Sequence, residues 1–340
     1  MITVKHPAPF AQPMRKEYGM GEKNNVNVHF LKDPERFAEV FNGYFGNGEK
    51  LIDPACLEDM SEKLDGPMVT DPETGKQGPY VERIRDVCKC YKGETILRIF
   101  CLEDQSYIDY TAAVRTLAMD GLGYQEQLDR LKKKHKEAND LTGDERLSGI
   151  GKDEKLIPII TLWWYHGKKT YDGPRRLKDS LMDAGTPWSA YVADYPLNVL
   201  TDQVDPKNFP GDFGVLYEAL LYQNDPEGMR RLFENDLRFQ HVNEETIKVL
   251  SVNMGNNALW EDRNRLLEKD GRNYNMCLAF DMIKEEGRAE GIKEGREEGR
   301  EQSFGDAIKA LMETQGVTID TAMTMLKIPE EKRDRFRAII

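Results

Sequence analysis

The stretch TILRIFCLE, residues 95–103, decides the fold. It is almost continuously apolar, which is typical of a strand that is buried on both faces. An earlier strand over residues 81–91 is separated from it by Lys92-Gly93-Glu94, a segment that suits a tight hairpin turn. We therefore expect an antiparallel pair of strands in the core of the protein.

Elements with alternating patterns surround this pair. Asp33-Pro34-Glu35 is a helix start signal, and Gly46-Asn47-Gly48 should end that helix. We expect the further elements to be a short helix near 55–63 within a loop over 53–79, a helix over 107–136, a surface loop over 138–154, a strand over 156–165, a short helix near 174–183, a strand near 195–201, and helices within 212–270. Such alternation predicts a mixed α/β sheet covered by helices.

The chain is predicted to have five parts. They are a loose arm over 1–29, a core over 30–205, a helical subdomain over 206–283, a glycine-repeat helix or linker over 284–303, and a small helical segment over 304–340. Glycine recurs every fourth residue in the repeat, at a cost of about 1 kcal/mol for each glycine in a helix. One interpretation of the repeat is a charged, solvated linker helix. The other is that the tail pairs two chains into a homodimer, or that it tethers three small helices over 304–340 to DNA or to a partner chain.

Composition excludes some classes of protein. The 340 residues include 60 acidic and 48 basic residues, a net charge of −12, which excludes a uniformly basic nucleic-acid-binding surface but not a local basic stripe. No apolar run is long enough for a membrane helix, and the N-terminus does not resemble a secretory signal. Five cysteines do not suggest a disulfide framework, so we expect a reducing cytoplasm.

Three polar residues on the two strands form the best candidate site. Asp86 lies in the first strand, and Glu103 and Gln105 share one face at the end of the second. Two carboxylates and an amide are suitable ligands for Mg²⁺. The alternative is structural: Asp86 would pair with Arg85 or Lys89, and Glu103 with a nearby cation.

These residues belong to a series of motifs that resembles the Rpn family of recombination-promoting nucleases, which are also described as transposase-like. The motifs run in order from about residue 30 to 302: AEVFN at 38–42, RDV at 85–87, LEDQSYIDY at 102–110, Arg115, Tyr124, LIPIITLWWYHGKKTYDGPRRLKD at 156–179, Asp194-Tyr195, NMC at 275–277 and the glycine repeat. Each motif is short, and their order makes the resemblance fairly specific.

The resemblance implies a restriction-endonuclease-like PD-(D/E)xK fold, a mixed sheet flanked by helices. It also implies a Mg²⁺-dependent DNA endonuclease in which Asp86 and Glu103 bind the metal, Gln105 takes the last motif position, and Glu39 is a further acidic candidate. Gln105 stands where the wider superfamily has lysine, so it can orient water but brings no charge. The alternative is a catalytically degenerate nuclease-fold protein that binds DNA or associates with itself.

Other residues are candidates for DNA contact. Arg115 and Tyr124 would contact phosphate or, equally well, brace the sheet from inside. The cluster Lys132, Lys133 and Lys134 would follow a DNA backbone or simply form a solvated helix end. The aromatic run 163–165 is expected in the core, and the cysteines are expected to be core or half-buried thiols rather than a zinc site.

Overall fold

The computed structural model describes residues 20–61, 63–65, 68–70, 77–79, 82–93, 97–182, 187–268 and 271–339. The chain divides into two compact units, one of which covers Phe10–Cys277 and the other of which contains Leu278–Ile340. Among the described residues, no helix has an apolar stretch long enough to cross a membrane.

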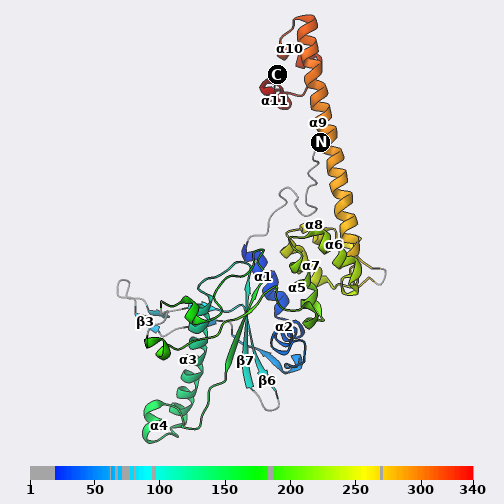
Figure 1. Ribbon diagram of the computed structural model, residues 1–340. Coiled ribbons are helices and arrows are strands. Elements are labelled where there is room, and N and C mark those ends of the chain that lie inside the picture. Colours follow the sequence, from blue (N-terminus) through cyan, green and yellow to red (C-terminus); the bar gives the residue numbers. More distant parts are fainter. Residues whose placement is uncertain are drawn as a thin grey trace. The chain divides into compact units, whose positions relative to one another are not determined.

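A five-stranded mixed sheet forms the centre of the first unit (Figure 1). Its strand order is β1 (Leu57–Asp59), β6 (Val87–Lys92), β7 (Leu97–Gln105), β8 (Ile159–Tyr165) and β9 (Asn198–Leu200). β1, β6 and β7 pair antiparallel, whereas β7, β8 and β9 pair parallel. The expectation of a mixed α/β sheet flanked by helices is confirmed.

The two faces of the sheet are covered by different helices (Figure 1). The long helix α3 (Ala112–Ala138) lies on one face, where Ala113 and Met119 share a buried cluster with Trp163. The other face carries α1 (Met20–Leu31) and α2 (Pro34–Gly46), together with helices from the second half of the chain. Phe41 of α2 packs edge-on against Phe100 of β7 at 4.9 Å between ring centroids. Burial from both sides explains why residues 99–102 and 159–165 are so apolar.

The remaining helices of this unit are short. They are α4 (Gly143–Ser148), α5 (Asp212–Leu221), α6 (Pro226–Asn235), α7 (Glu244–Met254) and α8 (Asn257–Glu261). Trp164 of β8 meets Phe213 of α5 at 5.0 Å between ring centroids, so α5 shares the face that α2 covers. The predicted helices within 212–270 are confirmed.

The start and end signals of α2 are confirmed. Asp33 is its N-cap and accepts hydrogen bonds from the backbone amides of Glu35 and Arg36, and Asn47 ends it in the left-handed conformation with φ of 50°. The expected arm over 1–29 is wrong for its last part, because residues 20–31 form α1; residues 1–19 lie outside the described residues. The buried Asn27 of α1 bonds Asp104 and Asn253, so a polar residue occupies a position where a sequence pattern looks for an apolar one.

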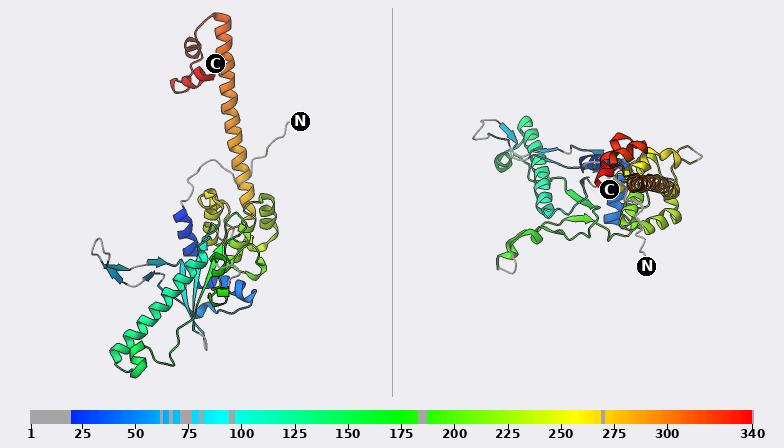
Figure 2. Two further views of the ribbon diagram at one scale, coloured as in Figure 1. Left: turned by 60° about the vertical axis from the view of Figure 1, so that its left-hand side comes forward. Right: turned by 90° about the horizontal axis from the view of Figure 1, so that it is seen from above.

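Several other boundaries differ from the expectation. The helix expected to begin at residue 107 begins at Ala112, and the loop expected over 138–154 contains α4, which lies near the end of α3 (Figure 2). The expected loop over 53–79 contains four three-residue strands, of which β2 (Lys63–Asp65) pairs with β5 (Glu82–Ile84), and β3 (Met68–Thr70) with β4 (Gln77–Pro79). The helices expected near 55–63 and 174–183 are single 3₁₀ turns at 54–56 and 177–180. Strands and turns this short carry too few residues for a period to be read.

The second unit is built from the C-terminal helices. The long α9 (Cys277–Gln315) contains the glycine repeat, and α10 (Ile319–Met325) and α11 (Glu330–Ile339) fold beside its last part (Figures 1 and 2). A small core joins the three helices around Ile308, Ala322, Met323 and Phe336. The segment after residue 304 is therefore the end of one long helix followed by two short ones.

Candidate functional site

Asp86 and Glu103 come together where β6 begins and β7 ends. The two strands are in register with Val87 opposite Leu102 and Cys88 opposite Cys101, so Asp86 and Glu103 are the next opposed residues. The backbone amide of Asp104 donates a hydrogen bond to Oδ2 of Asp86 at 2.7 Å. Opposed residues of an antiparallel pair project from the same face. The strand pairing therefore places both predicted carboxylates on the α3 side of the sheet.

Glu103 is a buried carboxyl group with an unusual environment. Only 3% of it is exposed, and its Oε1 has no hydrogen-bond partner among the described residues. Burial, followed by the charge of Asp86, raises the pKa of Glu103 to about 8, although Arg85 and Arg115 oppose this shift. A buried oxygen without a partner is costly, because it loses its water and gains nothing in return.

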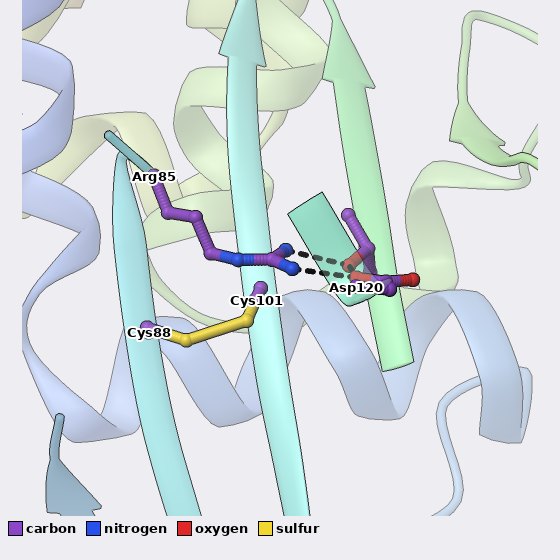
Figure 3. The surroundings of a disulfide bond; sticks show 5 residues. Arg85, Cys88, Cys101 and Asp120 are labelled. Carbon is purple, nitrogen blue, oxygen red and sulfur yellow. Dashed lines mark hydrogen bonds and ion pairs between the residues drawn. A yellow bond between two sulfur atoms is a disulfide. The ribbon is translucent and has the colours of Figure 1, made fainter. Parts of the chain in front are cut away.

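A buried polar network centres on Arg85 and Asp120 (Figure 3). Arg85 extends across β7 and donates hydrogen bonds to Oδ1 of Asp120 at 2.6 Å and to the hydroxyl of Thr161 at 2.8 Å. The Tyr195 hydroxyl donates to the other oxygen of Asp120 at 2.5 Å. Arg85 and Asp120 are each 2% exposed. The network therefore joins the start of β6 to α3, β8 and the segment before β9.

Two cysteines lie on the same strand pair, two residues along the chain from the carboxylates. Cys88 of β6 and Cys101 of β7 are opposed in the register and form a disulfide (Figure 3). The expectation that the cysteines are free thiols is wrong for this pair, whereas Cys56, Cys90 and Cys277 are free. Cys88 lies two residues from Asp86, and Cys101 two residues from Glu103, so the disulfide joins the two strands on which the carboxylates lie.

Two more predicted residues lie near Glu103. Gln105 is the last residue of β7, on the same strand face as Glu103, and its carbonyl accepts a hydrogen bond from the amide of His166 at 3.0 Å. Arg115, in the first turn of α3, pairs with Asp109 at 2.5 Å and lies 4.9 Å above the ring of Trp163. A third of the Arg115 side chain is exposed, so its guanidinium is accessible.

Glu39 and Tyr124 already have internal partners. The carboxylate of Glu39 accepts hydrogen bonds from the backbone amides of Gly211, Phe213 and Gly214 at the start of α5. Burial raises the pKa of Glu39 in spite of these bonds. The Tyr124 hydroxyl accepts a hydrogen bond from the amide of Ile159 at 3.1 Å. Glu39 therefore caps a helix, and Tyr124 braces the beginning of β8.

The lysine cluster lies far along α3 from Arg115. Lys132, Lys133 and Lys134 are exposed, and Lys134 lies 3.6 Å from Glu154. The 17 residues between Arg115 and Lys132 correspond to about 25 Å of helix at 1.5 Å per residue. Any contact of these lysines with DNA would therefore be remote from Glu103.

The donor set suits a hard cation better than a soft one. Among the described residues, no group of three or more His, Cys, Asp or Glu side chains is arranged to enclose a metal ion. Asp86, Glu103 and Gln105 instead offer two carboxylates and an amide, the oxygen ligands that Mg²⁺ accepts alongside water and substrate phosphate. The unpartnered Oε1 of Glu103 fits such a ligand.

Sequence reasoning missed the buried network and a second polar group. Asp120 and Thr161 were given no role, although an aspartate among Ala113, Thr116 and Met119 on the buried face of α3 is a detectable signal. Asp104 and His166 were also missed as a pair. Nε2 of His166 lies 2.9 Å from Oδ1 of Asp104, close enough for an ion pair but not aligned as a hydrogen bond.

Comparisons of the chain with protein-family models, with curated proteins and with solved structures found no match.

Replacing Asp120 tests the buried network. Asp120→Asn leaves Arg85 buried without its counter-charge, so we expect the free energy of unfolding to fall by about 3–5 kcal/mol in urea titrations. The exposed Asp129→Asn on the same helix should change it by no more than about 0.5 kcal/mol. A loss under about 1 kcal/mol for Asp120→Asn would show that the network does not hold these elements together.

The raised pKa of Glu103 predicts how the free energy of unfolding depends on pH. The unfolded carboxyl titrates near 4.5 and the folded one near 8, so the folded state keeps a proton that the unfolded state has lost. The stabilisation from Glu103 is therefore complete below pH 4.5 and disappears as pH rises through 8. In EDTA, wild type should lose stability relative to Glu103→Gln between pH 5 and pH 8, as measured by urea unfolding. A constant difference between the two proteins would contradict the raised pKa.

Proposed function

We propose that this protein is a Mg²⁺-dependent DNA endonuclease of the recombination-promoting type, built on a PD-(D/E)xK core. The observation that carries the proposal is that Asp86 and the buried Glu103 are opposed where β6 begins and β7 ends, and that one Glu103 oxygen has no hydrogen-bond partner among the described residues. The resemblance of the motifs to the Rpn family agrees with this assignment, and the mixed sheet agrees with the fold that the family has.

Asp86, Glu103 and the Gln105 side chain would hold the cation. When bound, Mg²⁺ would polarise the phosphodiester and lower the pKa of the attacking water. Glu103 must give up its proton to act as a ligand, and the positive charges of Arg85 and Arg115 favour its ionised form. A neutral Gln105 can orient water but cannot stabilise the charge that develops on the phosphate.

Arg115 compensates for the missing lysine in this proposal. Its guanidinium is partly exposed and lies close enough to Glu103 to affect the pKa of that group. A guanidinium can bind two phosphate oxygens at once. We therefore assign Arg115 the role of phosphate contact, which the sequence left open. Tyr124 has a structural role instead, because it braces the beginning of β8.

Plasmid nicking tests the proposal. Supercoiled DNA incubated with the full-length protein should be nicked with Mg²⁺ and remain intact in EDTA. Asp86→Asn and Glu103→Gln each remove a charged ligand, so we expect the rate of nicking to fall at least about 100-fold, since even outer-shell partners of a metal contribute 10- to 100-fold. The exposed Asp129→Asn is the matched control and should cut at the wild-type rate.

Two results would contradict the proposal. If both substitutions left nicking unchanged, Asp86 and Glu103 would not be the site. If wild type were inert and both variants melted at a higher temperature, the carboxylates would be a relic whose repulsion destabilises the fold. The second result would favour the alternative function, a degenerate nuclease-fold protein.

A further inference from the structure

A pocket opens directly beside the candidate site, at the carboxyl ends of β7 and β8. Its volume is about 780 Å³, which is within the usual range for a pocket that binds a small ligand. It begins at Ser106, the residue after Gln105, and includes Tyr165, which pairs with Gln105 in the sheet. The carboxyl ends of parallel strands are a common place for ligand binding.

Two exposed aromatic rings line the pocket. Tyr107 is 54% exposed and Tyr110 is 62% exposed, an unusual environment for two large rings that follow the end of β7 by only two and five residues. The Tyr110 hydroxyl donates a hydrogen bond to Asp172 at 2.9 Å, which fixes its ring at the edge of the pocket. Exposed aromatic faces are suitable surfaces for stacking unpaired bases.

Two lysines give the pocket positive charge. Lys168 and Lys169 follow β8 and are exposed. Their backbone carbonyls accept hydrogen bonds from Asn224 and from the Tyr165 hydroxyl, so the turn that carries them is fixed. Within the described part of the chain, neither ammonium group forms an ion pair. Asp172 is the one acidic residue that lines the pocket, and it is bonded to Tyr110.

The back of the pocket is a rigid polar network. His166 lines the pocket and contacts the buried Asp104, which accepts a hydrogen bond from Asn27 at 2.8 Å. Asn253, which also lines the pocket, donates to Asn27 at 2.6 Å. These contacts connect β7 and the residue after β8 with α1 and α7 behind the pocket.

We propose that this pocket binds an unpaired nucleotide of a polynucleotide strand, with its base on Tyr107 or Tyr110 and its phosphate on Lys168 and Lys169. A base inside a duplex is stacked on both faces and cannot reach a concave pocket, so the strand must be single at this point. The inference rests on the proposed nuclease function, because the pocket would hold the strand next to Glu103. A pocket of this kind makes single-stranded or locally opened DNA the preferred substrate.

Binding without cleavage tests the pocket separately from the metal site. The full-length protein is titrated, in EDTA, into a short fluorescein-labelled single-stranded oligonucleotide, and anisotropy is recorded at several salt concentrations. Tyr107→Ala/Tyr110→Ala should weaken binding at least about fivefold. Tyr107→Phe/Tyr110→Phe should keep most of it, because stacking needs the rings and only the bond of Tyr110 to Asp172 is lost. Lys168→Ala/Lys169→Ala should lower the salt slope by about 0.7, since the two lysines share one phosphate and each phosphate contact on a single strand contributes about 0.7.

Matched controls remove the same groups elsewhere. Lys152→Ala/Lys155→Ala removes two exposed lysines that precede β8, at the end of the strand opposite the pocket. Tyr191→Ala removes an exposed tyrosine outside the pocket. Both variants should bind the oligonucleotide as wild type does. Equal binding by wild type and the pocket variants would overturn the inference even if the protein cuts DNA. Equal affinity for a free nucleoside monophosphate would overturn the assignment to a strand. Pocket-dependent binding by a protein that never cuts would support the inference and reject the nuclease.

Discussion

The buried ion pair between Arg85 and Asp120 is the interaction on which the arrangement of the site depends. Arg85 precedes Asp86 directly, and Asp120 lies on α3 with Thr161 of β8 between them. Both charges are removed from water, so their cost is offset only while each keeps its partner. The pair thus fixes the residue before Asp86 against the helix and strand that surround Glu103, and it keeps a positive charge near a carboxyl group that would otherwise be harder to ionise.

The chemistry of the site follows from a balance of opposing effects on Glu103. Burial and Asp86 raise its pKa, whereas Arg85 and Arg115 lower it, and the result is a carboxyl group that is mostly protonated at neutral pH without a cation. In the function that we propose, a divalent cation would replace that proton, because its charge would favour the ionised form more strongly than either arginine does. The arrangement thus disfavours an empty, doubly ionised site and favours an occupied one.

The sequence predicted the parts of the fold that depend on long or strongly signalled segments. Residues 95–103 and 156–165 were expected as buried strands, and Asp33 and Asn47 were expected at the ends of a helix, because burial on both faces and capping leave marks in the local sequence. Asp86 and Glu103 were expected to converge because they lie on the two predicted strands and match motifs of the Rpn family, whereas their register was not predicted. The side-chain contacts between residues far apart in the sequence were not predicted. Asn27 with Asp104, Arg85 with Asp120, and Glu39 with the start of α5 join residues up to 175 positions apart, and no local pattern records such a partner.

Cation binding tests the central claim most directly, because it does not depend on the choice of DNA substrate. Mn²⁺ accepts the same oxygen ligands as Mg²⁺ and can be followed by its electron paramagnetic resonance signal as the protein is titrated. Above pH 8, where Glu103 is ionised, we expect one Mn²⁺ per chain that excess Mg²⁺ displaces, and we expect it to be lost in Glu103→Gln but retained in Asp129→Asn. Equal Mn²⁺ binding by wild type and Glu103→Gln would contradict the account.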